Sequence, residues 1–109
     1  MAIDIDVVPR KPIDLNFRAK DGTIDTYQME PPKGSIAMTL AERAQDAVAT
    51  GEVKTMWGEI EGWFIDGLGK KQWKRLNARL MDPADPLDIV HLVKAMEGVV
   101  EEVASNPSS

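Results

Sequence analysis

The chain has 109 residues, with thirteen Lys and Arg against eighteen Asp and Glu, no cysteine and one histidine. This length suits one domain with a single modest core, and the lack of cysteine excludes a disulfide framework, a thiolate zinc site and a cysteine nucleophile. One histidine excludes a two-histidine metal motif, and the net charge of −5 argues against a protein that coats DNA.

The N-terminal part is predicted to be β-rich. Apolar and polar residues alternate on either side of Asp21-Gly22, a dipeptide that favours a tight turn because glycine accepts a positive φ. This pattern predicts a β-hairpin over about 12–18 and 24–30. Residues 3–7 alternate as well and are a candidate third, edge strand. No signal-peptide pattern and no membrane-spanning apolar run is present, so we expect a soluble intracellular protein without membrane contact.

The chain beyond Pro32 takes a helical period and predicts a compact bundle of about four helices. The first begins at a capping box whose first residue is Thr39, and it stops at Gly51. Asp85 is the predicted N-cap of the last helix and Pro86 its first residue. The predicted second, third and fourth helices cover about 52–67, 70–81 and 86–104. The expected fold is α+β in one domain (1–109), with a β-rich part (1–32), a helical part (33–104) and a flexible tail (105–109).

Few side chains suggest chemistry. His91 lies off the main apolar face of its helix and has no evident nucleophile or orienting partner, so it is interpreted as a surface residue. Asp82, Asp85 and Asp88 fall in one short stretch, where three acids could hold a hard cation. Because the stretch lacks the pattern of a calcium loop, helix capping explains these acids better. We therefore expect no enzyme activity, no metal and no cofactor.

Two concentrations of residues point to binding instead. The predicted helix 70–81 carries five of the thirteen basic residues and no acid before Met81, and three tryptophans lie close together in the chain. Four short helices on so small a chain are not expected to bury every large apolar side chain, and surplus aromatic surface is typical of protein interfaces. Gly58 and Gly62 lie one turn apart, and each costs about 1 kcal/mol relative to alanine. Either they allow another helix to approach closely or they have no special role, and the sequence leaves both interpretations open. The predicted partner-binding residues are Trp57, Trp63, Phe64, Ile65, Lys70, Lys71, Trp73, Lys74 and Arg75.

The order of short sequence patterns resembles a known family. The stretch Gly67-Leu68-Gly69-Lys70-Lys71-Gln72-Trp73-Lys74-Arg75-Leu76 is followed by Arg79-Leu80-Met81-Asp82-Pro83-Ala84-Asp85-Pro86-Leu87-Asp88 and by an amphipathic helix ending in Glu101-Glu102-Val103. Upstream are a strand, Asp21-Gly22, a strand bearing Tyr27 and Pro31-Pro32. Together these segments, from Ile13 onward, are similar to the tail assembly chaperones of long-tailed bacteriophages, in particular those of phages that infect actinobacteria.

The resemblance implies a non-enzymatic role. Members of that family bind the long tape measure protein and keep it soluble until the tail tube forms around it. The resemblance also implies self-association, and association with a longer form made by programmed frameshifting, of which this chain would be the short form. The expected location is the cytoplasm of the infected host rather than the mature virion.

Two other classes of protein remain open from the sequence. The basic helix 70–79 could serve a small nucleic-acid-binding regulator, although the overall acidity and the lack of interleaved aromatics argue against nucleic acid as a partner. A minor structural protein of the virion is the other alternative. Salt-dependent DNA binding would favour the first class, and presence in purified particles would favour the second.

Overall fold

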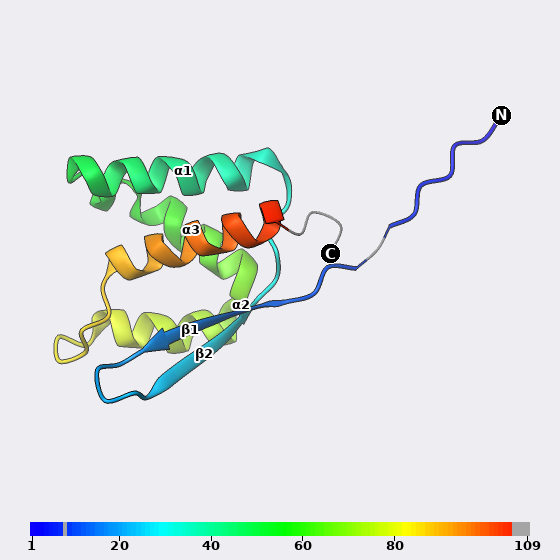
Figure 1. Cartoon of the computed structure of the whole chain (residues 1–109). Coiled ribbons are helices and arrows are strands. Elements are labelled where there is room, and N and C mark those ends of the chain that lie inside the picture. Colours follow the sequence, from blue (N-terminus) through cyan, green and yellow to red (C-terminus); the bar gives the residue numbers. More distant parts are fainter. Residues whose placement is uncertain (8, 106–109) are drawn as a thin grey trace.

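The computed structural model describes residues 1–7 and 9–105 and has the expected α+β architecture (Figure 1). A two-stranded antiparallel hairpin is followed by three helices, so the prediction of four helices is wrong in number. The elements are β1 (Ile13–Arg18), β2 (Ile24–Met29), α1 (Gly34–Thr50), a 3-10 turn (Val53–Met56), α2 (Trp57–Met81) and α3 (Ile89–Ser105).

The hairpin forms where the alternating pattern predicted it. Its register pairs Leu15 with Tyr27, and the turn is closed by the Ala19 N–H, which donates to the Thr23 carbonyl at 2.8 Å. The Gly22 N–H donates to the Ala19 carbonyl, and Gly22 has a φ of 90°, which a side chain would strain. This is a turn followed by a glycine bulge, a common three-residue hairpin connection.

Gly69 explains why the predicted second and third helices are one element. Helix α2 runs from Trp57 to Met81 as two helical stretches that meet in a kink at Gly69, which has φ 80° and ψ 161°, a conformation that is essentially restricted to glycine. The helix therefore changes direction at this residue instead of ending. Its first half lies beside α1, and its second half lies under the hairpin (Figure 1).

Two predicted helix starts are wrong. Helix α1 begins at Gly34 rather than at Thr39, with Lys33 before it and no side-chain cap, because its buried stripe extends towards the N-terminus to Ala37. Helix α3 begins at Ile89 rather than Pro86. The Asp85 Oδ1 accepts the Leu87 N–H at 3.0 Å, as a cap would, but the helix does not start until Ile89. The same carboxylate also pairs with another residue, described below.

Asp88 and His91 provide the actual start of α3. The Asp88 Oδ1 accepts the Ile89 N–H at 2.7 Å, and the His91 Nδ1 accepts the Asp88 N–H at 2.9 Å. This reciprocal arrangement resembles a capping box, with histidine in the usual place of glutamate. His91 thus has a local structural role.

The two chain ends differ from the predictions in different ways. Residues 1–7 form no strand and are exposed, so the candidate third strand is absent from this structure. The predicted tail begins at residue 105, which is one residue too early, because α3 runs through Ser105. The rest of that tail, residues 106–109, lies outside the described residues.

The core lies between the helices and one face of the hairpin. Its largest fully buried side chains come from β2, both halves of α2, and α3, and α1 adds the fully buried Ala41 and Ala44. Together they join the β-rich and helical parts in one hydrophobic cluster. They include Tyr27, Met29, Ile60, Phe64, Leu76, Leu92, Met96 and Val99.

Candidate functional site

The aromatic residues predicted to bind a partner belong to the core. Phe64 is fully buried, and Trp63 and Trp73 each keep only 7% of their surface exposed. Trp57 and Ile65 are partly buried and pack against the same cluster. The expectation of a surplus aromatic surface is therefore not met, and in the folded chain these side chains offer little area to a partner.

The change of direction at Gly69 accounts for this burial. Phe64 and Trp73 are nine residues apart, which would separate them by about 13.5 Å along a straight helix and place them on opposite faces. In the structure their ring centroids are 6.2 Å apart and the rings are stacked. Trp63 contacts Phe64 edge-on at 5.0 Å, and its indole N–H donates to the Ala37 carbonyl on α1 at 3.3 Å.

The predicted basic residues separate into two groups. Lys70, Lys71 and Lys74 are exposed on the second half of α2. Arg75 instead lies over the Tyr27 ring, with its Cζ 4.1 Å from the ring centroid, and donates to the Thr26 carbonyl at 2.7 Å. Arg75 therefore has a structural role on the hairpin, although 53% of its side chain stays exposed, whereas none of the three lysines has an ion pair in the described part of the chain.

Arg79, which was not among the predicted binding residues, holds the hairpin and the turn before α3 together. It forms a two-pronged ion pair with Asp85, at 2.7 and 3.1 Å, and donates to the Asp25 Oδ2 at 3.1 Å. The pairing with Arg79 holds the pKa of Asp85 below its ordinary value, and it raises the pKa of Arg79. Burial, followed by the hydrogen bond to Asp25, raises the pKa of Tyr27.

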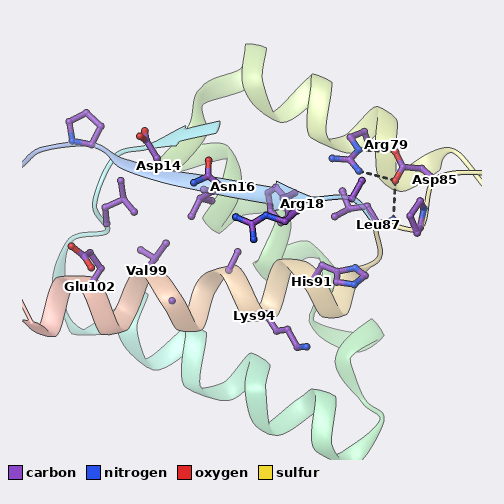
Figure 2. Close-up of a pocket in the computed structure, with 18 of the residues that line it drawn as sticks. Asp14, Asn16, Arg18, Arg79, Asp85, Leu87, His91, Lys94, Val99 and Glu102 are labelled. Atoms are coloured by element: carbon purple, nitrogen blue, oxygen red, sulfur yellow. Dashed lines mark hydrogen bonds and ion pairs between the residues drawn. The ribbon is translucent and has the colours of Figure 1, made fainter. Parts of the chain in front are cut away.

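A large groove lies between β1 and α3, and the Arg79–Asp85 pair lines it (Figure 2). Its volume is about 1320 Å³. Apolar side chains from both elements line it, and Gly98 and Ala95 leave room along the surface of α3. The apolar lining residues with some exposed surface are Ile13, Phe17, Ala95 and Val103, and the buried Leu15, Leu87 and Val99 lie beneath them.

Charged groups line both ends of this groove. Arg18 and Lys94 line one part, and no ion pair engages either of them in the described part of the chain. Asp14 and Glu102 lie towards the other end, as Figure 2 shows. Both ends of the groove carry mixed charges, because Arg10 and Lys11 also line it next to Asp14, and Asp82 and Asp85 line it near Arg18.

The outer edge of β2 is closed by α2. The Gln72 side-chain amide accepts the Gln28 N–H at 2.9 Å and donates to the Gln28 carbonyl at 2.8 Å, as a neighbouring strand would. The Arg75 guanidinium similarly donates to the Thr26 carbonyl, and the Glu30 N–H donates to the Gly67 carbonyl. No further strand can add to this edge without displacing those bonds.

The outer edge of β1 is open. Because the Ala19 N–H bonds to Thr23, the alternation of an antiparallel ladder directs the backbone groups of Asp14, Asn16 and Arg18 away from β2. Within residues 1–7 and 9–105, no backbone hydrogen bond reaches these outward groups. An unpaired row of N–H and C=O groups beside an apolar groove is a template for another extended segment.

Sequence reasoning missed this groove. Its walls come from β1 and α3, more than 70 positions apart in the chain, and neither carries a motif. Two features of the sequence could have indicated it. The alternation in β1 predicts one apolar face, and an isolated two-stranded hairpin is marginal in water, so another element had to pack against that face. Among the described residues, no three His, Asp or Glu side chains lie together in a way that could hold a metal ion. Asp82 and Asp88 accept local backbone N–H groups instead.

Comparison with known proteins gives no assignment. No protein-family model matches the chain, and searches of curated proteins and of solved structures find no significant similarity. Among the described helices, none has the length and apolar character that crossing a bilayer requires.

Proposed function

We propose that this protein is a tail assembly chaperone of the long-tailed bacteriophage type, in its short form, which binds the tape measure protein and keeps it soluble. The family and the client come from the sequence resemblance described above. The structural observation that carries the proposal is the open, apolar groove between β1 and α3, flanked by an unpaired strand edge.

Such a groove suits a holding function. A client that has not yet assembled exposes apolar side chains and unpaired backbone groups, and both kinds of group find partners here. The apolar lining of the groove can cover apolar side chains of the client. The outward backbone groups of Asp14, Asn16 and Arg18 can form hydrogen bonds to an extended segment of the client. We therefore place client binding at this groove and not at the buried aromatic cluster, with Lys70, Lys71 and Lys74 as a separate exposed basic patch.

A matched pair of glycine substitutions tests this assignment. Gly98 lines the groove, Gly62 lies on α2 outside it, and a Cβ at either position meets no atom within 4 Å. Both sites should therefore accept a larger side chain without loss of folding. The tape measure protein of the same phage is coexpressed with wild type, Gly98→Glu or Gly62→Glu, and its soluble fraction is measured.

We expect wild type and Gly62→Glu to keep the tape measure protein soluble and Gly98→Glu to lose most of that effect. A tape measure protein that is equally insoluble with and without the wild-type chain would refute the chaperone assignment. Retention of the activity in folded Gly98→Glu would refute the groove as its site. A salt-sensitive gel shift with DNA would instead favour a nucleic-acid-binding regulator.

A further inference from the structure

The first seven residues form an apolar and acidic arm without a partner. Ile3, Ile5 and Val7 alternate with Asp4 and Asp6, the period of a strand with one buried face. Yet the three apolar side chains are 85%, 79% and 89% exposed. Figure 1 shows this arm running away from the folded body. Three large aliphatic side chains on one face, all exposed, indicate a surface that is covered in another state.

The free edge of β1 has the properties that this arm requires. An added strand would lie about 4.8 Å from β1 and pair with the outward groups of Asp14, Asn16 and Arg18. The alternating stretch of the arm, residues 3–7, is five residues long and so nearly as long as β1, which has six. With Ile3, Ile5 and Val7 on the face of Leu15, they would extend that apolar face over the groove.

The charges agree with the same placement. When the apolar residues of the arm face inwards, Asp4 and Asp6 share the outer face with Asp14, Asn16 and Arg18. In the antiparallel register that sets Asp4 opposite Arg18, Asp6 lies opposite Asn16, so neither acid is directly opposite Asp14. Arg18 on β1 and Lys94 on α3 both line the groove, and neither has an ion-pair partner in the described part of the chain. The net charge of the chain is −5, so an acidic arm needs a local basic surface such as this one to bind.

The arm of a given copy is directed away from its own groove. The Arg10 guanidinium donates to the Pro32 carbonyl at 2.9 Å, which ties the segment before β1 to the start of the helical part. To pair with β1 of the same chain, the backbone would have to reverse direction within residues 8–12, a range that includes Arg10 and its bond to Pro32. A second copy can receive the arm without any such rearrangement.

We propose that residues 1–7 of one copy add as a third strand to the free edge of β1 in a second copy, within the groove beside α3. Reciprocal exchange of the two arms closes a symmetric dimer. This inference does not depend on the chaperone assignment, because it concerns only the arm and the groove.

The lack of native cysteine allows a direct test by disulfide formation between copies. One copy carries Asp6→Cys, and a second copy with a size tag carries Asn16→Cys or Arg18→Cys on β1. Ala49→Cys, exposed on α1 outside the groove, is the control. After mixing and mild oxidation, the mixed disulfide is measured on a non-reducing gel. We expect a mixed product with at least one β1 position and several-fold less with Ala49→Cys.

Self-association provides the second measurement, by sedimentation of the full chain over a range of concentrations. We expect deletion of residues 1–7 to abolish the dimer. Ile5→Asp should weaken it by about a hundredfold or more, because a symmetric dimer loses two buried aliphatic side chains and each is worth at least about tenfold. Met81→Asp, at an exposed methionine outside the groove, should leave the dimer unchanged.

Three results would overturn the proposal. They are a wild-type chain that stays monomeric, an arm-deleted chain that dimerises as tightly as wild type, and mixed disulfides no more abundant with β1 than with Ala49→Cys. A disulfide that forms only within a double variant, Asp6→Cys with Asn16→Cys, would show that the arm folds onto its own strand and would equally refute exchange.

Discussion

At the scale of single residues, Arg79 connects three parts of the fold. It extends from the second half of α2 to Asp25 on β2 and to Asp85 in the turn before α3. Because both bonds to Asp85 are charge-assisted and share one planar guanidinium, the geometry is specific as well as favourable. This pair fixes the end of the groove, where the turn before α3 approaches the hairpin.

The Arg79–Asp85 pair predicts a pH dependence of stability. The folded-state pKa of Asp85 lies below its ordinary value of 3.8, so the unfolded chain binds the proton more readily. The contribution of this pair is therefore complete above about pH 5 and is lost as the pH falls through the folded-state pKa. We expect Asp85→Asn to unfold at lower urea than wild type at pH 7, with a smaller difference at pH 3. A difference of the same size at both values would contradict this role.

Phe64 tests the assignment of the aromatic cluster to the core. Truncating a fully buried phenylalanine costs about 3–5 kcal/mol, so Phe64→Ala should lower the free energy of unfolding by that amount. Met81→Ala, at an exposed position, should change it by less than about 0.5 kcal/mol. Urea unfolding at neutral pH measures both. If Phe64→Ala were as mild as Met81→Ala, the cluster would have to be reconsidered as a binding surface.

At the scale of elements, the sequence predicts what depends on local pattern. Alternation and Asp21-Gly22 predicted the hairpin, and apolar periodicity located the helical segments. The number of helices could not be predicted, because a glycine that ends a helix and one that bends it have the same local sequence. Whether Gly69 does one or the other depends on the packing of Trp73 against Phe64.

The candidate site was less predictable than the fold. The sequence identified Trp63, Phe64 and Trp73 as large apolar side chains but not the elements that would cover them. Their burial requires the bend in α2 and the approach of α1, which are tertiary effects. The groove depends on the distance between β1 and α3, and no residue pattern in either element encodes that distance.

Two glycines of α2 predict opposite effects on stability. A Cβ at Gly62 meets no atom within 4 Å, so Gly62→Ala should stabilise the helix by about 1 kcal/mol. A Cβ at Gly67 would lie 2.8–3.2 Å from three atoms of the buried Met29 side chain. Gly67→Ala should therefore lower the free energy of unfolding by about 1–2 kcal/mol.

Thermal or urea unfolding of the two alanine variants measures this contrast. Equal effects would contradict the close packing of Met29 against α2. The open space at Gly62 also bears on the close helix approach considered for Gly58 and Gly62, because within the described residues no atom comes near either Cβ position. The gain expected from Gly62→Ala is therefore not offset by a clash inside the chain.

At the scale of the whole molecule, the hairpin has one closed edge and one open edge. Side chains of α2 satisfy the outer groups of β2, whereas β1 borders the groove with its outer groups unpaired. An isolated two-stranded sheet is marginal in water, so a third strand from another chain would complete it. The proposed arm exchange and the proposed client binding use this same edge, and we therefore expect a bound client to release the arm.

The pairing of this edge can be measured directly by backbone amide hydrogen exchange of β1. The amides of Asp14, Asn16 and Arg18 should exchange slowly in the full chain at high concentration and rapidly once residues 1–7 are deleted. Adding the tape measure protein to the arm-deleted chain should restore their protection. If these three amides exchange at the same rate in the full chain, the arm-deleted chain and the client complex, then the open edge of β1 is not where this protein binds.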